Sequence, residues 1–375
     1  MSTFATALAY STDSAGMNPA HTLPMKLRAI AEAGFPQVEI GFPDLEAYAS
    51  QAFSGYKELD NSGKGDLYKL LKTAKEIREL CRELGLKVLV VHPFSEFEGY
   101  DDERKRKENM TRARAWFKVL AVLIPVLLSL ENDSLFRQAL DCQMLQVGSS
   151  DDPSSSSDLD VMARDLRVLA DEAAAQEPPI KIAYEMWAWG AHVNTWEHTW
   201  EVCKRVDRPN FGLCLDTFQI SARAYADPSS SDGRLLAAQD RLADSLSALS
   251  NTIPPEKIFY FQISDGSHKH GVDALKASAQ KQGIDPLYAW SNAWRPLPFQ
   301  DEIEGKKGDE GYGGYLPVVE ICEAVVRTGW RGPWSFEVFY EKDMSRDDPE
   351  VPRRWARSAK ASYEKIEGKL RERGL

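Results

Sequence analysis

The segment KIAYEMWAWGAHVNTWEHTWEVCKRVDRPNFGLCLDT, residues 181–217, decides the fold of this chain. It opens with one run rich in β-forming residues, Lys181–Trp187, and closes with another, Phe211–Thr217. Between them, Thr195–Val206 has the apolar spacing of an amphipathic helix. Two largely apolar strands joined through a helix are typical of parallel strands that are buried on both faces.

The same alternation extends over the whole chain. The expected strands are Thr6–Tyr10, Gln37–Phe42, Lys87–His92, Gln143–Val147, Lys181–Trp187, Phe211–Thr217, Lys257–Ser264 and Trp334–Phe339. The expected helices include Leu67–Leu84, Asp158–Ala174, Thr195–Val206, Leu235–Leu249 and Leu316–Arg327. Eight such units predict an α/β fold in which residues 1–375 form one domain, a single (β/α)8 TIM barrel. An open doubly wound sheet is the alternative, but no GxGxxG turn follows the first strand.

Three segments exceed a minimal barrel. Ser149–Ser157 is a polar loop after the fourth strand, and Ser264–Gly314 is a long loop after strand 7, on the active-site side. The third, Ala121–Gln138, is an atypical insertion that interrupts what should be one helix leading into the fourth strand. We expect it to be either an extra apolar helix on the outside of the barrel or a non-coding stretch retained by an erroneous gene model.

Composition and charge narrow the class of partner. The net charge of −11 argues against nucleic acid and against an anionic membrane, and it favours a small-molecule substrate. Five cysteines are scattered without a CxxC pair, which predicts a reduced, cytoplasmic protein rather than a disulfide framework. The sequence does not decide between a monomer and a homo-oligomer.

Four polar residues stand at the expected ends of strands five to eight, each inside an apolar run. They are Glu185, Asp216, Gln262 and Glu337. Catalytic groups of such barrels come from these strand ends, so the four side chains should converge. Three buried acids would repel one another unless a divalent cation relieved the repulsion, or unless each acid paired with a Lys or Arg. Carboxylate and amide oxygens are hard ligands, suited to one Mg²⁺, Mn²⁺ or Co²⁺.

Several longer stretches are similar to a known superfamily. They are HPFSEFEG at 92–99, YEMWAWGAHVNTW at 184–196, VDRPNFGLCLDTFQISARAYAD at 206–227, KIFYFQ at 257–262 and GYLPV at 314–318. They resemble the xylose isomerase-like TIM barrels, a superfamily of sugar phosphate isomerases and epimerases, and within it most closely the fungal 3-dehydroshikimate dehydratases. The family's metal ligands fall on the same four residues.

The resemblance implies a metal-dependent lyase of quinate and shikimate catabolism. Such an enzyme removes water from 3-dehydroshikimate, or a similar cyclic hydroxy-ketone, through a metal-stabilised enolate to give protocatechuate. The same metal chemistry also serves isomerases and epimerases that act on a ketose or an inosose. A sugar or inosose isomerase or epimerase is therefore one alternative, and a catalytically inactive barrel is another.

Two histidines are candidates for proton transfer beside the metal. His92 ends the third expected strand and His192 follows the fifth, so both belong to the mouth of the barrel. Either is a candidate acid or base near neutral pH, or a rim residue that only makes hydrogen bonds. Glu185 and Glu337 are catalytic candidates as well as ligands.

Candidate substrate-binding residues follow the same strands. Arg223 would clamp a substrate carboxylate or pair with the next helix, and Trp187 and Trp294 would form an apolar wall or pack outside the site. Gln219 occupies the position at which bacterial dehydratases of the family carry a histidine. Asn292 stands where a basic residue is usual, which would favour a related enzyme with a changed substrate.

Overall fold

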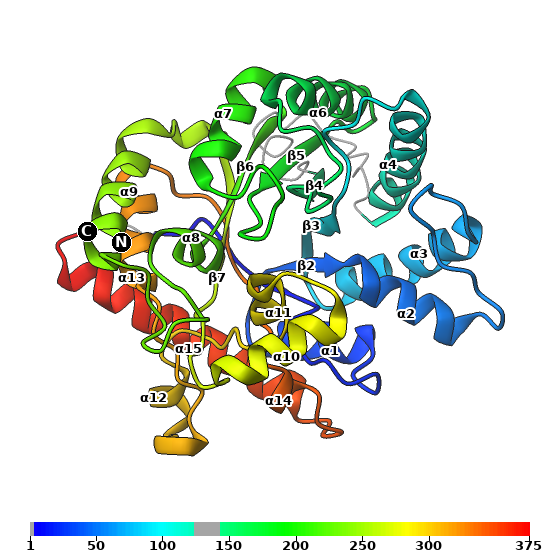
Figure 1. The fold of residues 1–375 in the computed structure, drawn as a ribbon. Helices are drawn as coiled ribbons and strands as arrows, with labels where there is room; N and C mark the ends of the chain where they lie inside the picture. Colours follow the sequence, from blue (N-terminus) through cyan, green and yellow to red (C-terminus); the bar gives the residue numbers. More distant parts are fainter. Residues whose placement is uncertain (1–3, 124–142) are drawn as a thin grey trace, which may run out of the picture.

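Eight parallel strands close into a barrel in the computed structural model, which describes residues 4–123 and 143–375 (Figure 1). Each strand pairs with its neighbours in chain order, and β8 returns to β1. The single (β/α)8 barrel predicted from the alternation is therefore confirmed. The strands are β1 Leu8–Ser11, β2 Gln37–Gly41, β3 Lys87–Phe94, β4 Gln143–Gly148, β5 Ile180–Glu185, β6 Phe211–Asp216, β7 Ile258–Ile263 and β8 Trp334–Phe336.

Helices surround the strands (Figure 1). Apart from the short helices that follow β7, the helices of the described residues are α1 Leu23–Glu32, α2 Phe42–Ala52, α3 Leu67–Glu83, α4 Glu103–Leu123, α6 Leu159–Ala174, α7 Trp196–Val206, α8 Thr217–Ala224, α9 Ala238–Thr252, α13 Val318–Arg327, α14 Glu341–Met344 and α15 Val351–Glu372. Most of the expected insertion Ala121–Gln138 lies outside the described residues, and α4 is described up to Leu123.

The first and last strands differ from their expected bounds. β1 begins two residues later than Thr6, and β8 ends at Phe336 instead of Phe339. Beyond Phe336 the chain leaves β1, because the Val338 N–H donates to Ser14 Oγ over 2.8 Å. Residue 339 instead makes an isolated antiparallel bridge with Arg295. Glu337 therefore lies just beyond the last strand.

The long segment after β7 contains short helices rather than an irregular loop. These are α10 Val272–Gln282, α11 Pro286–Ala293, α12 Gln300–Glu304 and the 3₁₀ turn η2 Gly308–Glu310; another 3₁₀ turn, η1 Pro255–Lys257, precedes β7. An antiparallel bridge between Ser267 and Gly314 ties the two ends of this segment together. The segment thus forms an ordered wall on the side of the strand C-termini.

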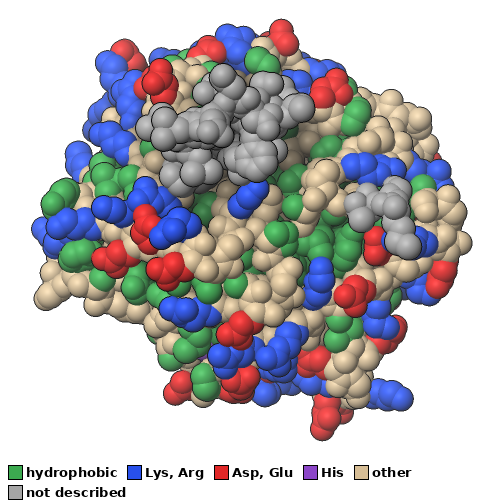
Figure 2. All heavy atoms as spheres, turned by 180° about the vertical axis from the view of Figure 1, so that it is seen from behind, with side chains coloured by type: hydrophobic (Ala, Val, Ile, Leu, Met, Phe, Trp, Pro, Cys, Tyr) green, Lys and Arg blue, Asp and Glu red, His purple; other side chains and the backbone are tan. Residues whose placement is uncertain are grey.

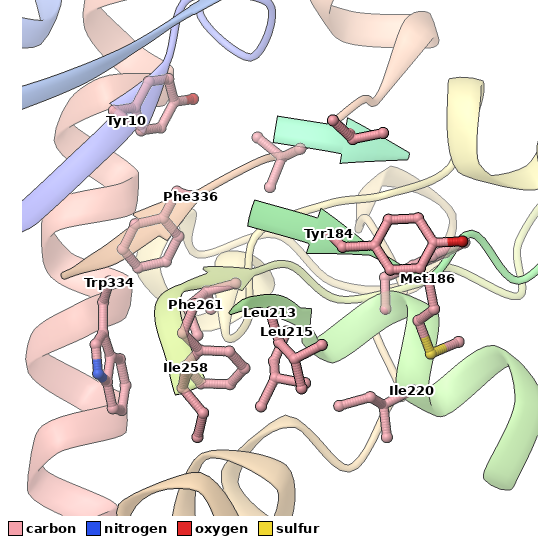
Figure 3. Close-up of a cluster of buried hydrophobic side chains, with 14 of the residues drawn as sticks. Tyr10, Tyr184, Met186, Leu213, Leu215, Ile220, Ile258, Phe261, Trp334 and Phe336 are labelled. Carbon is pink, nitrogen blue, oxygen red and sulfur yellow. The ribbon is translucent and has the colours of Figure 1, made fainter. Parts of the chain in front are cut away.

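Two apolar layers leave room for a polar layer at the mouth. On the outer face of the strands, Leu213, Phe261 and Phe336 pack in the main core (Figure 3). Inside the barrel, a smaller cluster that includes Met144, Cys214 and Tyr260 fills the interior. The polar ends of the strands lie beyond this cluster, on the side where active sites of such barrels occur.

The surface carries charges of both signs. On the face seen in Figure 2, acidic and basic side chains are interspersed. Within residues 4–123 and 143–375, no helix has the length and apolar character that crossing a membrane requires.

Candidate metal centre

Three of the predicted ligands meet at the mouth of the barrel. Glu185 ends β5, Asp216 ends β6 and Glu337 follows β8. One carboxylate oxygen from each lies within 4.8 Å of the other two, and the residues are only 1%, 0% and 7% exposed. Side chains that are far apart in sequence converge because the C-terminal ends of parallel strands share one rim.

Glu185 keeps one oxygen free of hydrogen bonds. Its Oε2 accepts from the Gln146 amide and from Trp187 Nε1, the latter over 3.0 Å. Its Oε1 is buried and has no hydrogen-bond partner among the described residues. The indole of Trp187 fits only because residue 148 is glycine, since a Cβ there would lie 2.2 Å from the ring. The surroundings therefore orient the carboxylate and leave Oε1 without a hydrogen-bond partner among the described residues.

Asp216 is held by the helix that follows it. Its Oδ1 caps α8 by accepting from the Phe218 and Gln219 N–H groups, over 2.5 and 3.0 Å. Its Oδ2 accepts from Arg295 over 2.6 Å. Capping by an acidic residue is favourable because the first N–H groups of a helix lack partners within it.

Arg295 is the main site residue that the sequence did not reveal. Its guanidinium is 2.6 Å from Asp216 and 3.1 Å from Glu337, and the residue is 1% exposed. It also donates to the hydroxyls of Ser264 and Ser291. It lies in the segment after α11, where the sequence carries no strand or helix periodicity.

Gln262 faces the same interior and is bonded to two neighbours. Its Nε2 donates to Glu39 Oε2 over 3.0 Å, and the Cys214 thiol is 3.4 Å from its Oε1. A carboxylate accepts hydrogen bonds and cannot donate them when ionised, so Glu39 determines which way the amide points. Glu39 is a lone acid in the apolar run of β2, which is the same signal that singled out the four ligands.

His92 joins the site, as expected from its place at the end of β3. Its Nδ1 is 3.5 Å from Glu337 Oε1, and its Nε2 is 3.0 Å from Ser11 Oγ. The same Nε2 is 3.9 Å from Glu39. The imidazole therefore lies between a predicted ligand and the acid that orients another.

His192 and Gln219 make backbone contacts at the rim. His192 Nε2 is 2.8 Å from the carbonyl oxygen of Ser155, in the loop after β4. Gln219 Oε1 accepts from the Ala188 N–H over 2.8 Å, so its amide ties α8 to the loop after β5. Among the described contacts, neither side chain reaches the three carboxylates.

Arg223 and Trp294 also lie apart from the carboxylates. Arg223 donates to Asn194 over 3.3 Å and lines a cavity of about 410 Å³ next to α7 and α9. The ring of Trp294 packs against His270, with 5.2 Å between centroids. Trp187 is different, because its hydrogen bond to Glu185 places it in the site.

Burial and mutual repulsion disfavour the charged forms of these acids. Burial, with added repulsion from Glu337 and Asp216, raises the pKa of Glu185 well above its usual value. Burial also raises the pKa of Asp216 to about 6, although the Arg295 charge opposes the rise. For Glu39, burial raises the pKa to about 7. A cation among them would favour the ionised forms and offset this cost.

A divalent cation is therefore expected to stabilise the fold more strongly as pH rises from about 4 to 7. Because the pKa of Asp216 in the folded protein is raised to about 6, its contribution to the free energy of unfolding is present at low pH and lost as pH rises through that value. The loss is on the order of 3 kcal/mol for a shift of this size. Urea titrations with Mn²⁺ and with a chelator measure the difference.

Asp216→Asn is the control for this experiment. The substitution removes one titrating group. The difference in the free energy of unfolding between the protein with Mn²⁺ and the protein with a chelator should therefore become smaller and change less with pH. Equal stabilisation by Mn²⁺ at both ends of the pH range in the wild-type protein would contradict the prediction.

Comparisons with known proteins identify the family of this barrel. A family model described as a xylose isomerase-like TIM barrel matches residues 27–365. The 3-dehydroshikimate dehydratase of Neurospora crassa is 30% identical over 360 residues, which are 94% of this chain and 90% of that protein. The 3-dehydroshikimate dehydratase of Pseudomonas aeruginosa is 32% identical over 85% of this chain, but the match spans only 36% of that longer protein.

Solved structures share the barrel. A xylose isomerase-like TIM barrel/4-hydroxyphenylpyruvate dioxygenase fusion protein superposes with a TM-score of 0.66 at 26% identity, over 98% of this chain and 44% of that one. The IOLI protein with a bound zinc atom superposes with a TM-score of 0.61 over 97% and 99% of the two chains. At 16% identity, that second likeness concerns the fold alone.

Proposed function

Since this chain belongs to the xylose isomerase-like TIM-barrel family, we propose that it is a metal-dependent lyase that dehydrates 3-dehydroshikimate to protocatechuate. The observation that carries the proposal is the match to the Neurospora crassa dehydratase over 90% of that protein's length. The buried acidic cluster at the strand ends supports a reaction that uses a metal ion.

The residues present fit a hard divalent cation. Three carboxylates share a space 4.8 Å across, and the buried Oε1 of Glu185 has no hydrogen-bond partner among the described residues. Gln262 would offer its Oε1 as a fourth ligand, because its Nε2 already donates to Glu39. The Cys214 thiol that now contacts this Oε1 is a weak hydrogen-bond donor, so a metal ion would displace it easily. We infer Mg²⁺, Mn²⁺ or Co²⁺, since all four ligand atoms are oxygens.

The chemistry requires an acidified C–H, a base and an acid. A bound divalent ion would polarise the substrate ketone and lower the pKa of the adjacent C–H. His92 is the base that the geometry favours, because it lies among the polar strand ends while His192 is bonded to a loop carbonyl. Its hydrogen bond with Ser11 holds the ring in place.

Aromatic side chains beside Glu185 favour a flat, cyclic substrate. The rings of Trp187 and Trp189 stack with 5.3 Å between centroids, and Tyr288 stacks on Trp189 at 4.5 Å with an interplanar angle of 2°. This row joins the loop after β5 to α11, so it forms one wall of the mouth. A wall of this kind suits an unsaturated ring better than an open-chain ketose.

The reducing cytoplasm is the setting we propose. Within the described part of the chain, Cys81, Cys203, Cys214 and Cys322 are all free and buried. Cysteines of this kind are typical of proteins that are kept reduced.

Formation of protocatechuate from 3-dehydroshikimate is the test. Purified protein with Mn²⁺ is expected to produce the ultraviolet absorbance of a catechol ring, and a chelator should abolish it. Chromatographic identification of the product distinguishes dehydration from epimerisation, which would leave the absorbance unchanged and yield a stereoisomer. A protein that binds one Mn²⁺ per chain but does not convert 3-dehydroshikimate would overturn the dehydratase assignment and favour an isomerase or epimerase.

A further inference from the structure

The loop after β1 is clamped on both sides of a single acidic residue, Asp13. Before it, Thr12 Oγ1 accepts from the Gly41 N–H over 2.9 Å, which ties the loop to the end of β2. After it, Ser14 Oγ accepts from the Val338 N–H over 2.8 Å, which ties the loop to the residue that follows Glu337. Asp13 is therefore fixed at the mouth of the barrel, between the end of β2, the strand that carries Glu39, and the residues that follow β8.

The carboxyl group of Asp13 lies directly on a glycine. A Cβ at Gly41 would be 1.7 Å from Asp13 Oδ1, so any larger residue there would displace the acid. The side chain lines a cavity of about 380 Å³, and Phe339, two residues beyond Glu337, lines the same cavity. The acid thus lines a cavity at the mouth of the barrel that also reaches Phe339, and it is not one of the three clustered carboxylates.

One acid, Asp44, and one cation, Lys26, are the nearest charged neighbours of Asp13. Lys26 of α1 is 2.6 Å from Asp44 Oδ1 of α2, and both side chains are largely buried. The other oxygen of Asp44, Oδ2, is buried without a hydrogen-bond partner among the described residues, and the Asp13 carboxyl is within hydrogen-bonding reach of Asp44. Two carboxylates cannot bond to each other unless one holds a proton.

The other charged neighbours do not remove this need for a proton. Lys26 is already paired with Asp44, and Glu337 adds a further negative charge near Asp13. His21 lines the cavity, but its Nε2 is 3.0 Å from the Asp348 carbonyl oxygen. Burial, followed by the charge of Asp44, raises the pKa of Asp13 well above its usual value. The surroundings of Asp13 therefore favour its protonated form at the mouth of the barrel.

We propose that Asp13 is the catalytic acid that protonates the hydroxyl leaving the substrate. The inference rests on the proposed dehydration. In that reaction, the proton of the C–H next to the ketone passes to a base, and its electron pair forms the new C=C bond as the C–O bond breaks. The hydroxyl takes the proton of Asp13 and departs as water, and solvent then reprotonates the carboxylate. No oxidant or further reactant is required.

Hydrogen exchange in D₂O distinguishes the loss of the catalytic acid from the loss of the base. In D₂O with Mn²⁺, an Asp13→Asn enzyme is expected to form protocatechuate at least about 100-fold more slowly, which is typical for the loss of a general acid. It should nevertheless exchange the C–H next to the ketone for C–D in recovered 3-dehydroshikimate, because the base is intact. Proton NMR of the recovered substrate measures exchange, and ultraviolet absorbance measures elimination.

Metal content and a neighbouring substitution are the controls. Asp13→Asn should keep a wild-type Mn²⁺ content, because Asp13 is not among the proposed ligands. Gln51→Ala, which changes an exposed residue lining the same cavity, should keep wild-type elimination. Should the asparagine variant prove unstable, Asp13→Ser is expected to show the same split between exchange and elimination.

The outcomes are distinct. Elimination at the wild-type rate in Asp13→Asn, or an equal loss of exchange and elimination, would overturn the role of Asp13 and leave the dehydratase assignment standing. If the wild-type protein itself converts no 3-dehydroshikimate, the proposed function fails and the role of Asp13 fails with it.

Discussion

Replacing Glu185 by glutamine is expected to reduce turnover of 3-dehydroshikimate by about 1000-fold and to lower the metal content of the purified protein. The substitution removes one of three clustered carboxylates and substitutes a neutral amide for a charged ligand. Lewis-acid stabilisation of a transition state is worth several kcal/mol, which corresponds to a rate factor of this order. Steady-state kinetics and metal analysis of the dialysed protein measure the two effects.

Stability distinguishes this loss from simple unfolding. Glu185 is a buried acid whose pKa is raised by burial and by Glu337 and Asp216, so its neutral replacement relieves repulsion in the metal-free protein. Metal-free Glu185→Gln should therefore be at least as stable as the wild type in urea near neutral pH. Glu197→Gln, at an exposed position on α7, is the matched control and should change neither property. Wild-type metal content and activity in Glu185→Gln would disprove the metal centre.

Replacing Arg295 by methionine is expected to lower the free energy of unfolding of the metal-free protein by about 3–5 kcal/mol. The guanidinium is the cation between Asp216 and Glu337, and without it two buried carboxylates face each other uncompensated. Because the total stability of a domain is typically about 5–15 kcal/mol, this loss should be obvious in urea titrations with a chelator present. Mn²⁺ should recover part of it, since the metal supplies positive charge at the same place.

An exposed ion pair provides the comparison. Arg327 is 2.7 Å from Glu323, but its side chain is 52% exposed, so Arg327→Met should cost no more than about 1 kcal/mol. Arg295→Lys should be intermediate, because an ammonium keeps the charge and loses the planar set of donors that reaches Ser264, Ser291 and both acids. A loss in Arg295→Met as small as that in Arg327→Met would mean that the carboxylates do not depend on this cation.

The predicted ligands were accessible from the sequence because each carried a strong local signal. A single polar residue inside an apolar strand run has to be compensated, and the four strand ends had to share one rim once a barrel was inferred. The structure brings Glu185, Asp216 and Glu337 together, with Gln262 facing the same interior. Glu39 carries the same signal in β2, a strand outside the last four whose ends are predicted to hold the metal.

Residues in loops had no comparable signal. Arg295 and Asp13 lie in the site or at its edge, yet neither follows a helical or alternating pattern in the sequence. Conversely, Arg223 and Trp294 were predicted to bind the substrate, and the structure places them beside a separate cavity and against His270. The number of residues after a strand does not determine the direction in which a loop side chain points.

The sequence by itself determined the eight-unit barrel, its order and the strand ends that hold the acids, because hydrophobic periodicity is a local property that every strand and helix repeats. Only the tertiary structure decided what compensates those acids and what faces them. Arg295 reaches Asp216 because residue 339 pairs with it, and Asp13 is held at the mouth because Thr12 and Ser14 are bonded to different strands. These contacts join segments up to several hundred residues apart, so they arise from the closure of the barrel rather than from any local pattern.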